Sequence, residues 1–240
     1  MTMITSEATT RTECAISIGV GHIGLQGILS VPEDSSGLVL FAQGSGSSRH
    51  TLRNRFLAEA FGEAGLATLL LDLLTTGEEL IDFDTGHLRF DIELLADRLI
   101  AATDWLAQEP STRDLRIGYL GASTGAAAAL VAAAGRPDLV GAVVSRSGRP
   151  NLAGAALHRI QAPTLLIVGG DDLSVIDSNR QAMEQLRCRR KLEIIPGATH
   201  LFEEPGTLAR VAELAGAWFT HHLPLASPSS RALAKEPAFS

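Results

Sequence analysis

Aromatic residues, cysteines and long apolar runs are scarce in this chain of 240 residues. Aromatic side chains make up only 5% of the sequence, so the core is expected to consist of the Leu, Val, Ile and Ala that dominate its 45% hydrophobic fraction. The only cysteines, Cys14 and Cys188, imply no disulfide framework and suit a reducing compartment. No run is as long as a membrane span, and residues 1–13 lack the apolar segment of a signal peptide. We expect a soluble, cytoplasmic protein.

An excess of positive charge and the common metal-binding spacings are also absent. The formal net charge of −7 argues against a nucleic-acid-binding surface. The seven histidines are dispersed, and no HxH, HExxH or CxxC spacing occurs. These absences predict a protein without a metal or other cofactor, and without a nucleic-acid or membrane partner.

The chain does contain a regular alternation of β-rich apolar runs and helical patterns. Strands are expected at residues 15–20, 24–31, 37–43, 67–73, 115–120, 141–145, 164–168 and 191–195, the first two as an antiparallel pair. Helices are expected at 52–64, 88–108, 124–134, 177–186 and 207–221. Eight strands with intervening helices predict a doubly wound α/β sheet that binds ligands at the carboxyl ends of its strands.

The length of the chain predicts a single domain, which we place at residues 14–222. Residues 1–13 are then an N-terminal extension whose first five residues resemble the start of a vector reading frame, and 223–240 form a flexible tail rich in Pro, Ser and Ala. The acidic segment 75–87 lacks regular periodicity, so a loop bordering the pocket entrance is expected there.

A G-x-S-x-G motif at residues 121–125 carries the strongest chemical signal. It stands between an apolar, strand-like run and an alanine-rich helix. A serine on such a sharp turn is strained and exposed, and the N–H groups at the helix N-terminus can stabilise an oxyanion. We interpret Ser123 as a nucleophile; the alternative is a tight turn whose glycines serve only packing.

A serine nucleophile needs a base, and the base needs an acid that orients it. His200 follows the last expected strand through a short Pro-Gly loop, whereas the other histidines lie far from that position or end the terminal helix. Asp171 and Asp172 both follow the strand that ends at residue 168. The spacing favours Asp172 as the acid, with Asp171 left to cap the turn.

The sequence also suggests residues for the oxyanion hole and for substrate binding, although the motifs that point to them are less specific than the G-x-S-x-G motif. The backbone N–H groups of Thr124 and Ser45 are candidates for the oxyanion hole, with Gly44 as an alternative to Ser45. Candidate substrate-binding residues are Gln43, Arg146, Arg149, Leu173 and Phe202. The two arginines could bind a substrate carboxylate or phosphate, or could instead pair with acids of the segment 75–87. The two apolar residues could equally belong to the core.

The chain resembles the dienelactone hydrolase-like branch of the α/β-hydrolase superfamily from about residue 37 to residue 221. The matching segments are FAQGSGSSRHTLRNR, LLLDLL, LRFDIELLADRL, GYLGASTG, PTLLIVGGDDLSV and IPGATHLFEEPG. The resemblance implies an eight-stranded hydrolase core without a large cap, acting on ester or lactone carbonyls, with Ser123, Asp172 and His200 as its triad. Two positions depart from the family: the best-known members have cysteine where Ser123 stands, and many relatives have histidine where Gln43 stands.

The serine at position 123 favours ordinary esters over dienelactones. We therefore expect a serine hydrolase that cleaves a small-molecule carboxylic ester or lactone through an acyl-enzyme, as a monomer or homodimer. Two alternatives remain. The same triad could act on other electrophiles such as phosphotriesters or carbamates, or the protein could be a non-enzymatic α/β-hydrolase-fold protein that binds a small ligand.

Overall fold

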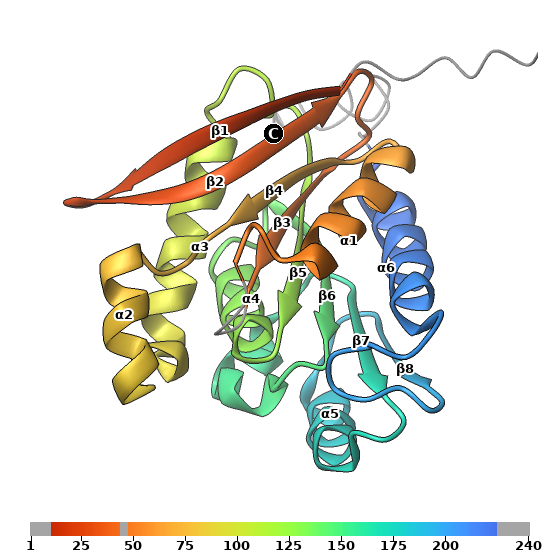
Figure 1. Ribbon diagram of the computed structural model, residues 1–240. Coiled ribbons are helices and arrows are strands. Elements are labelled where there is room, and N and C mark those ends of the chain that lie inside the picture. The colour runs from red at the N-terminus through yellow and green to blue at the C-terminus, as the bar shows by residue number, and fades with distance from the viewer. Residues whose placement is uncertain (1–10, 44–47, 225–240) are drawn as a thin grey trace, which may run out of the picture.

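A single eight-stranded sheet forms the centre of the computed structural model, which describes residues 11–43 and 48–224 (Figure 1). The strands are β1 (Arg11–Val20), β2 (Ile23–Pro32), β3 (Leu38–Ala42), β4 (Ala67–Leu71), β5 (Ile117–Ala122), β6 (Val140–Arg146), β7 (Thr164–Gly169) and β8 (Arg190–Ile195). Their order in the sheet is β1-β2-β4-β3-β5-β6-β7-β8. β1 and β2 pair antiparallel, as do β2 and β4, and all other pairs are parallel. The expected fold class and all eight strands are confirmed.

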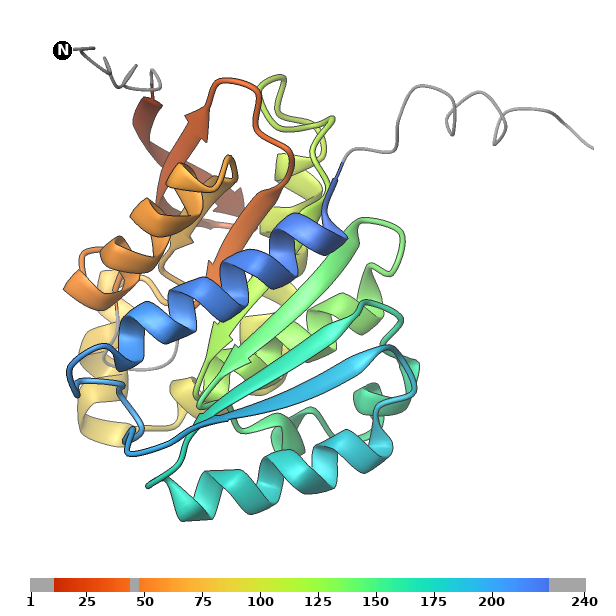
Figure 2. The ribbon, with the colours of Figure 1, turned by 90° about the vertical axis from the view of Figure 1, so that its right-hand side faces the viewer.

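Helices cover both faces of the sheet. They are α1 (Leu52–Glu63), α2 (Thr76–Thr85), α3 (Ile92–Leu106), α4 (Thr124–Gly135), α5 (Leu173–Gln185) and α6 (Thr207–His222), with two 3-10 segments, η1 (Leu88–Phe90) and η2 (Pro150–Arg159). α1 and α6 lie side by side on one face and share one apolar core with it (Figure 2). α3, α4, η2 and α5 contribute to a second core on the other face. The two cores cover the central strands β3, β4, β5, β6 and β7 from both sides, which explains the continuous apolar runs of these strands.

The segment 75–87, expected as a loop, is mostly helix α2. Thr75 caps this helix, since its side chain accepts a hydrogen bond from the Glu78 backbone and the Glu78 carboxylate accepts one from the Thr75 backbone at 2.8 Å. The capping box is visible in the sequence as T-x-x-E, but the apolar Leu80 and Phe83 of this helix are exposed and periodicity alone does not reveal it. η2 was likewise not predicted, and α5 begins four residues earlier than expected.

The packed part of the chain extends slightly beyond both expected domain limits. β1 begins at Arg11, inside the expected extension. Leu223, assigned to the tail, is fully buried, and it packs where a Cβ at Gly37 or Gly118 would come within 2.6 or 3.0 Å of it. Because glycine has no side chain, these two positions leave room for the Leu223 side chain. No helix in the described ranges is long and apolar enough to cross a membrane.

Candidate active site

Ser123 lies on the turn between β5 and α4, in a backbone conformation that non-glycine residues rarely adopt, with φ 51° and ψ −121°. The flanking glycines make this turn possible. A Cβ at Gly121 would lie 2.4 Å from the Ala126 Cα, and one at Gly125 would lie 2.3 Å from the Ala42 carbonyl oxygen. The glycines therefore serve close packing, and that packing holds the serine at the carboxyl end of β5.

Backbone hydrogen bonds hold this turn against the next strand. The Ser123 N–H donates to the Arg146 carbonyl at the end of β6 (3.4 Å), and the Ser123 carbonyl accepts from the Arg149 N–H (3.1 Å). The serine is the N-cap residue of α4, yet its side chain caps no helix N–H group. The hydroxyl is thus left available for chemistry, and the N–H of Thr124, in the first turn of the helix, has no partner within the helix.

His200 and Asp172 lie together at the same edge of the sheet. The His200 Nδ1 is 2.6 Å from the Asp172 Oδ2, and the carboxylate is 12% exposed. Asp171 is exposed, and its backbone N–H donates to the Ala198 carbonyl. Of the two adjacent aspartates, the structure thus brings Asp172 to the histidine.

The contact with Asp172 leaves the other ring nitrogen of His200, Nε2, to face a reacting group. Among the described residues, no hydrogen bond joins the Ser123 hydroxyl to His200. Catalytic hydrogen bonds are often long before substrate binds.

The loop that carries His200 is fixed by contacts on both sides. A Cβ at Gly169 would lie 2.3 Å from the Ala198 carbonyl oxygen, so the backbone at the end of β7 packs closely against this loop. Glu204 accepts hydrogen bonds from the Thr199 side chain (2.6 Å) and the Thr199 backbone (3.1 Å), which lower the pKa of the Glu204 carboxyl. Sequence reasoning missed Glu204, because its role depends on how the loop folds back on itself.

The candidate substrate-binding residues occupy different environments. Gln43 is buried, and its Oε1 accepts from Asn54 at 2.7 Å. Arg146 is also buried, whereas Arg149 is exposed and its guanidinium lies 6.0 Å from the centre of the Phe90 ring. Leu173 is exposed directly after Asp172.

The structure bears on two alternatives that the sequence left open. Phe202, a candidate pocket wall, has a positive φ of 55° and is buried in the core beneath α1 and α6. Of the four acids of segment 75–87 that were candidate partners for the arginines, two pair with other residues: Glu78 forms an ion pair with Arg98, and Asp82 forms one with Arg89. The predicted oxyanion donor Ser45 and its alternative Gly44 lie outside the described residues.

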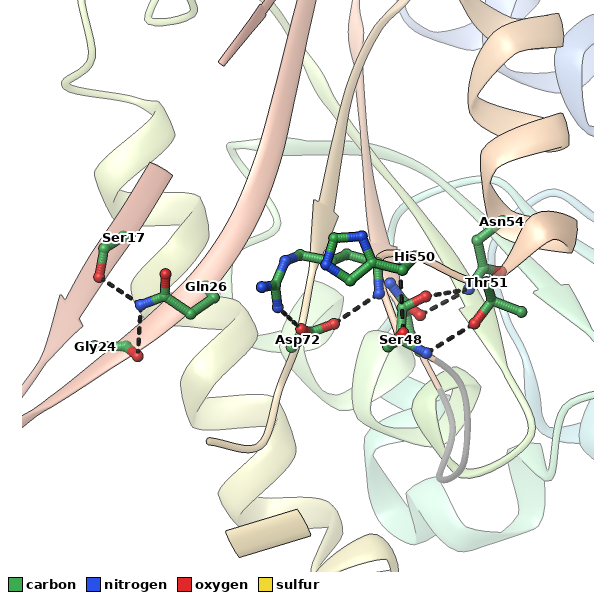
Figure 3. A network of polar contacts seen from close by, with 10 residues as sticks. Ser17, Gly24, Gln26, Ser48, His50, Thr51, Asn54 and Asp72 are labelled. Atoms are coloured by element: carbon green, nitrogen blue, oxygen red, sulfur yellow. Dashed lines mark hydrogen bonds and ion pairs between the residues drawn. The ribbon is translucent and has the colours of Figure 1, made fainter. Parts of the chain in front are cut away.

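A polar network joins the segment after residue 47 to the end of β4 and to helix α1 (Figure 3). Arg49 forms an ion pair with Asp72 at the end of β4, and its backbone N–H also donates to that carboxylate at 2.7 Å. The Ser48 carbonyl accepts from Asn54 at 3.2 Å. A cavity of about 650 Å³ lies beside this network, lined by residues that include Arg49, Asp72 and Glu79. Burial, with a smaller contribution from Asp72, raises the pKa of Glu79.

Within the described ranges, no group of three or more His, Cys, Asp or Glu side chains is arranged to hold a metal ion. What the geometry offers instead is a strained serine at a helix N-terminus and a histidine bonded to a carboxylate, all following strands of an α/β-hydrolase sheet.

The protein is thus an α/β-hydrolase-fold protein. It belongs to the dienelactone hydrolase family, whose sequence model matches residues 39–219. The crystal structure of a dienelactone hydrolase from Anabaena variabilis is 60% identical, covers 89% of this chain and 99% of that chain, and superposes with a TM-score of 0.87.

More distant comparisons agree on the fold. A dienelactone hydrolase-like promiscuous phosphotriesterase, P91 from metagenomic libraries, is 19% identical with a TM-score of 0.71, over 89% of this chain and 99% of that one. This level of identity shows the fold alone.

Two curated proteins of Mycobacterium tuberculosis, provisionally named phosphoribosyl transferases, are 54% identical over 89% of this chain and 47% of their own length. The chain therefore spans about half the length of these curated relatives.

Proposed function

We propose that this protein is a serine hydrolase that cleaves carboxylic esters or lactones through an acyl-enzyme. One observation carries the proposal: a strained serine at the start of α4 shares a sheet edge with the His200–Asp172 pair, whose Nδ1–Oδ2 distance is 2.6 Å. A serine hydroxyl is a weak nucleophile near neutral pH, and a histidine oriented by a carboxylate is the arrangement that activates it.

In the proposed mechanism, the Ser123 oxygen attacks the ester carbonyl while His200 Nε2 takes its proton. Asp172 keeps Nδ1 protonated and stabilises the positive charge that develops on the ring. The Thr124 N–H at the start of α4 stabilises the oxyanion, together with a second N–H that we assign to Ser45. His200 then protonates the leaving alcohol, and a water molecule activated by the same histidine releases the acid from the serine.

A covalent probe tests the nucleophile directly. We expect a fluorophosphonate probe to label the wild-type protein and a Ser111→Ala variant, because Ser111 is an exposed serine remote from this edge. Ser123→Ala should remain folded and unlabelled. Labelling of Ser123→Ala at the wild-type rate would contradict the assignment. An unlabelled wild-type protein would favour the binding-only alternative.

A substrate panel then defines the electrophile. p-Nitrophenyl esters of increasing acyl length, several lactones and a phosphotriester would be compared by kcat/KM. We expect turnover of esters or lactones. With a phosphotriester we expect one burst followed by inactivation, since a phosphorylated serine is hard to release.

We do not extend the phosphoribosyl transferase name of the Mycobacterium tuberculosis relatives to this chain. The alignment covers 89% of this chain and therefore overlaps most of the stretch matched by the dienelactone hydrolase family, and the relatives are about twice as long as the matched segment. We therefore assign hydrolysis to this chain and leave phosphoribosyl transfer to the part of the relatives that it does not match. Phosphoribosyl transfer by this purified chain would contradict that division.

A further inference from the structure

Strand β8 forms one edge of the sheet. It comes last in the strand order, and among the described strands it pairs only with β7. Figure 2 views the sheet from this edge. Every residue of β7 is buried, whereas in β8 only the last residue, Ile195, is buried. The outer edge of β8 therefore presents backbone N–H and C=O groups to which another strand can bond.

The hydrogen bonds between β7 and β8 define which backbone groups face this outer edge. The Thr164 N–H of β7 donates to the Arg189 carbonyl, and the Gly170 N–H after β7 donates to the Ile195 carbonyl. In a parallel pair, alternate residues of a strand direct both their N–H and their C=O to the same neighbour. Arg189 and Ile195 belong to the set that faces β7. The residues whose N–H and C=O groups face outward are therefore Arg190, Leu192 and Ile194.

The sequence of β8 is complementary to itself in one antiparallel register. When a two-fold axis passes beside Leu192, the outward groups of Leu192 bond to the same residue of a second copy, and those of Arg190 bond to Ile194 of that copy. The two strands then share about six main-chain hydrogen bonds. Lys191 lies opposite Glu193 of the second copy on both sides of the axis, at the pairs where cross-strand side chains are closest. This register therefore joins opposite charges twice.

Other registers bring like charges together. An axis beside Lys191 or beside Glu193 places that residue opposite itself, which destabilises a strand pair. A lysine on an edge strand normally prevents pairing, and Glu193 compensates Lys191 only when the axis passes beside Leu192. The antiparallel orientation also keeps the two Arg189 residues about 20 Å apart along the strands, well beyond the distance at which salt screens exposed charges.

The side chains on both faces of the edge fit the same pairing. Lys191 and Glu193 form an ion pair of 2.6 Å within the chain and line a cavity of about 330 Å³ beside α6. Across the axis, two such ion pairs would combine into one network of four charges. On the other face, Ile194 is 38% exposed. The aliphatic part of Arg190 from the second copy would cover it.

We propose that this protein forms a homodimer in which β8 pairs antiparallel with β8 of a second copy, with the two-fold axis beside Leu192. The pairing continues one sheet through both copies. It selects the homodimer from the two states expected from the sequence. The inference is independent of the proposed hydrolysis, because neither Lys191 nor Glu193 takes part in that mechanism.

Charge variants test the register. Sedimentation equilibrium of the full chain measures the dissociation constant of the dimer. Lys191→Glu and Glu193→Lys each place like charges at both cross-strand pairs, and each should raise this constant by about 10- to 100-fold. An equimolar mixture of the two variants should associate again as a heterodimer, because every glutamate then faces a lysine. Arg180→Glu makes a similar change of charge in an exposed ion pair of α5 and should have no effect.

A wild-type protein that stays monomeric throughout the concentration series would overturn the proposal. A mixture of the two variants that associates no better than either variant alone would overturn it as well. Circular dichroism and thermal unfolding verify that each variant is folded.

Hydrogen exchange identifies the strand that pairs. The amides of Leu192 and Ile194 should be protected increasingly as the concentration of wild-type protein rises, whereas those of Lys191 and Glu193, which face β7, should be protected at every concentration. Ile194→Pro removes an outward N–H without removing a bond to β7, and it should weaken the dimer as Lys191→Glu does. A dimer in which the Leu192 and Ile194 amides exchange as fast as in Lys191→Glu would have a different interface, and the proposal would be wrong.

Discussion

Replacing Asp172 by Asn tests the proposed catalytic pair most directly. The side chain keeps its shape, and its carbonyl oxygen can still accept a hydrogen bond at Nδ1 of His200. It loses the negative charge that would face the ring when His200 takes the serine proton. We expect the variant to bind substrate normally and to lose most of its kcat.

The expected loss follows from the geometry. Asp172 Oδ2 and His200 Nδ1 are 2.6 Å apart, so the centres of the two charges are separated by somewhat more. Opposite charges about 4 Å apart attract by about 4 kcal/mol at the effective dielectric of a protein surface, which we adopt because the His200 side chain is 40% exposed. This energy corresponds to a decrease in kcat of about 10³-fold.

The neighbouring acid provides the matched control. Asp171→Asn removes the same charge one residue away, but Asp171 is exposed and is held through its backbone. It should change kcat by less than about 3-fold, because exposed charges are screened by water and salt. Both variants would be assayed with one ester of the panel, and thermal unfolding would verify that each is folded.

The reasoning fails if Asp172→Asn keeps more than a tenth of the wild-type kcat, or if Asp171→Asn loses as much as Asp172→Asn. In the second case, the long-range field of both carboxylates would matter rather than the direct contact with His200. A loss of folding in Asp172→Asn would be examined with Asp172→Glu, which retains the charge but displaces it, and which should recover part of the activity.

Three further predictions concern the elements that support the site. Gly125→Ala places a Cβ 2.3 Å from the Ala42 carbonyl oxygen and should cost more than about 3 kcal/mol in urea unfolding, whereas Gly77→Ala, with open space around it, should not destabilise the protein. Arg98 holds the pKa of Glu78 at about 2, below its usual 4.5, so this pair stabilises the fold above about pH 4.5 and loses that effect as the pH falls toward 2. Glu78→Gln should therefore destabilise by about 1–2 kcal/mol at pH 7 and by roughly half as much at pH 3, and an equal difference at both pH values would contradict this account. Glu204→Gln should loosen the loop around His200 and lower kcat by about 3- to 10-fold with little change in KM, while Glu213→Gln on the outer face of α6 should have no effect.

The sequence predicted the sheet well because its central strands are buried on both faces. Such strands are continuous apolar runs, and their order along the chain determined where the motifs would lie. Helix α2 and the 3-10 segment η2 were not predicted, because neither is a long segment with apolar residues at regular helical spacing. The capping box at Thr75 was a local signal that could have revealed α2.

Side-chain environments were the weaker part of the sequence reasoning. Leu173 and Phe202 had the same prediction, yet one is exposed and the other is in the core. The difference depends on the positive φ at Phe202 and on how its loop packs, neither of which has a periodic signature. For the same reason Glu204, which holds Thr199 next to His200, was not singled out.

By itself, the sequence determined the sheet, the G-x-S-x-G turn and the chain order of serine, aspartate and histidine, because apolar periodicity and glycine spacing are local properties. The spacing in the sequence favoured Asp172 over Asp171, but only the tertiary structure shows its contact with His200, since that contact joins residues 28 positions apart. Only the tertiary structure showed that Arg146 is buried and that its Nη1 has no hydrogen-bond partner among the described residues. Each of these two features depends on which side chains come into contact where separate strands end at the same edge of the sheet. Such contacts join residues far apart in the chain, so local sequence patterns do not predict them.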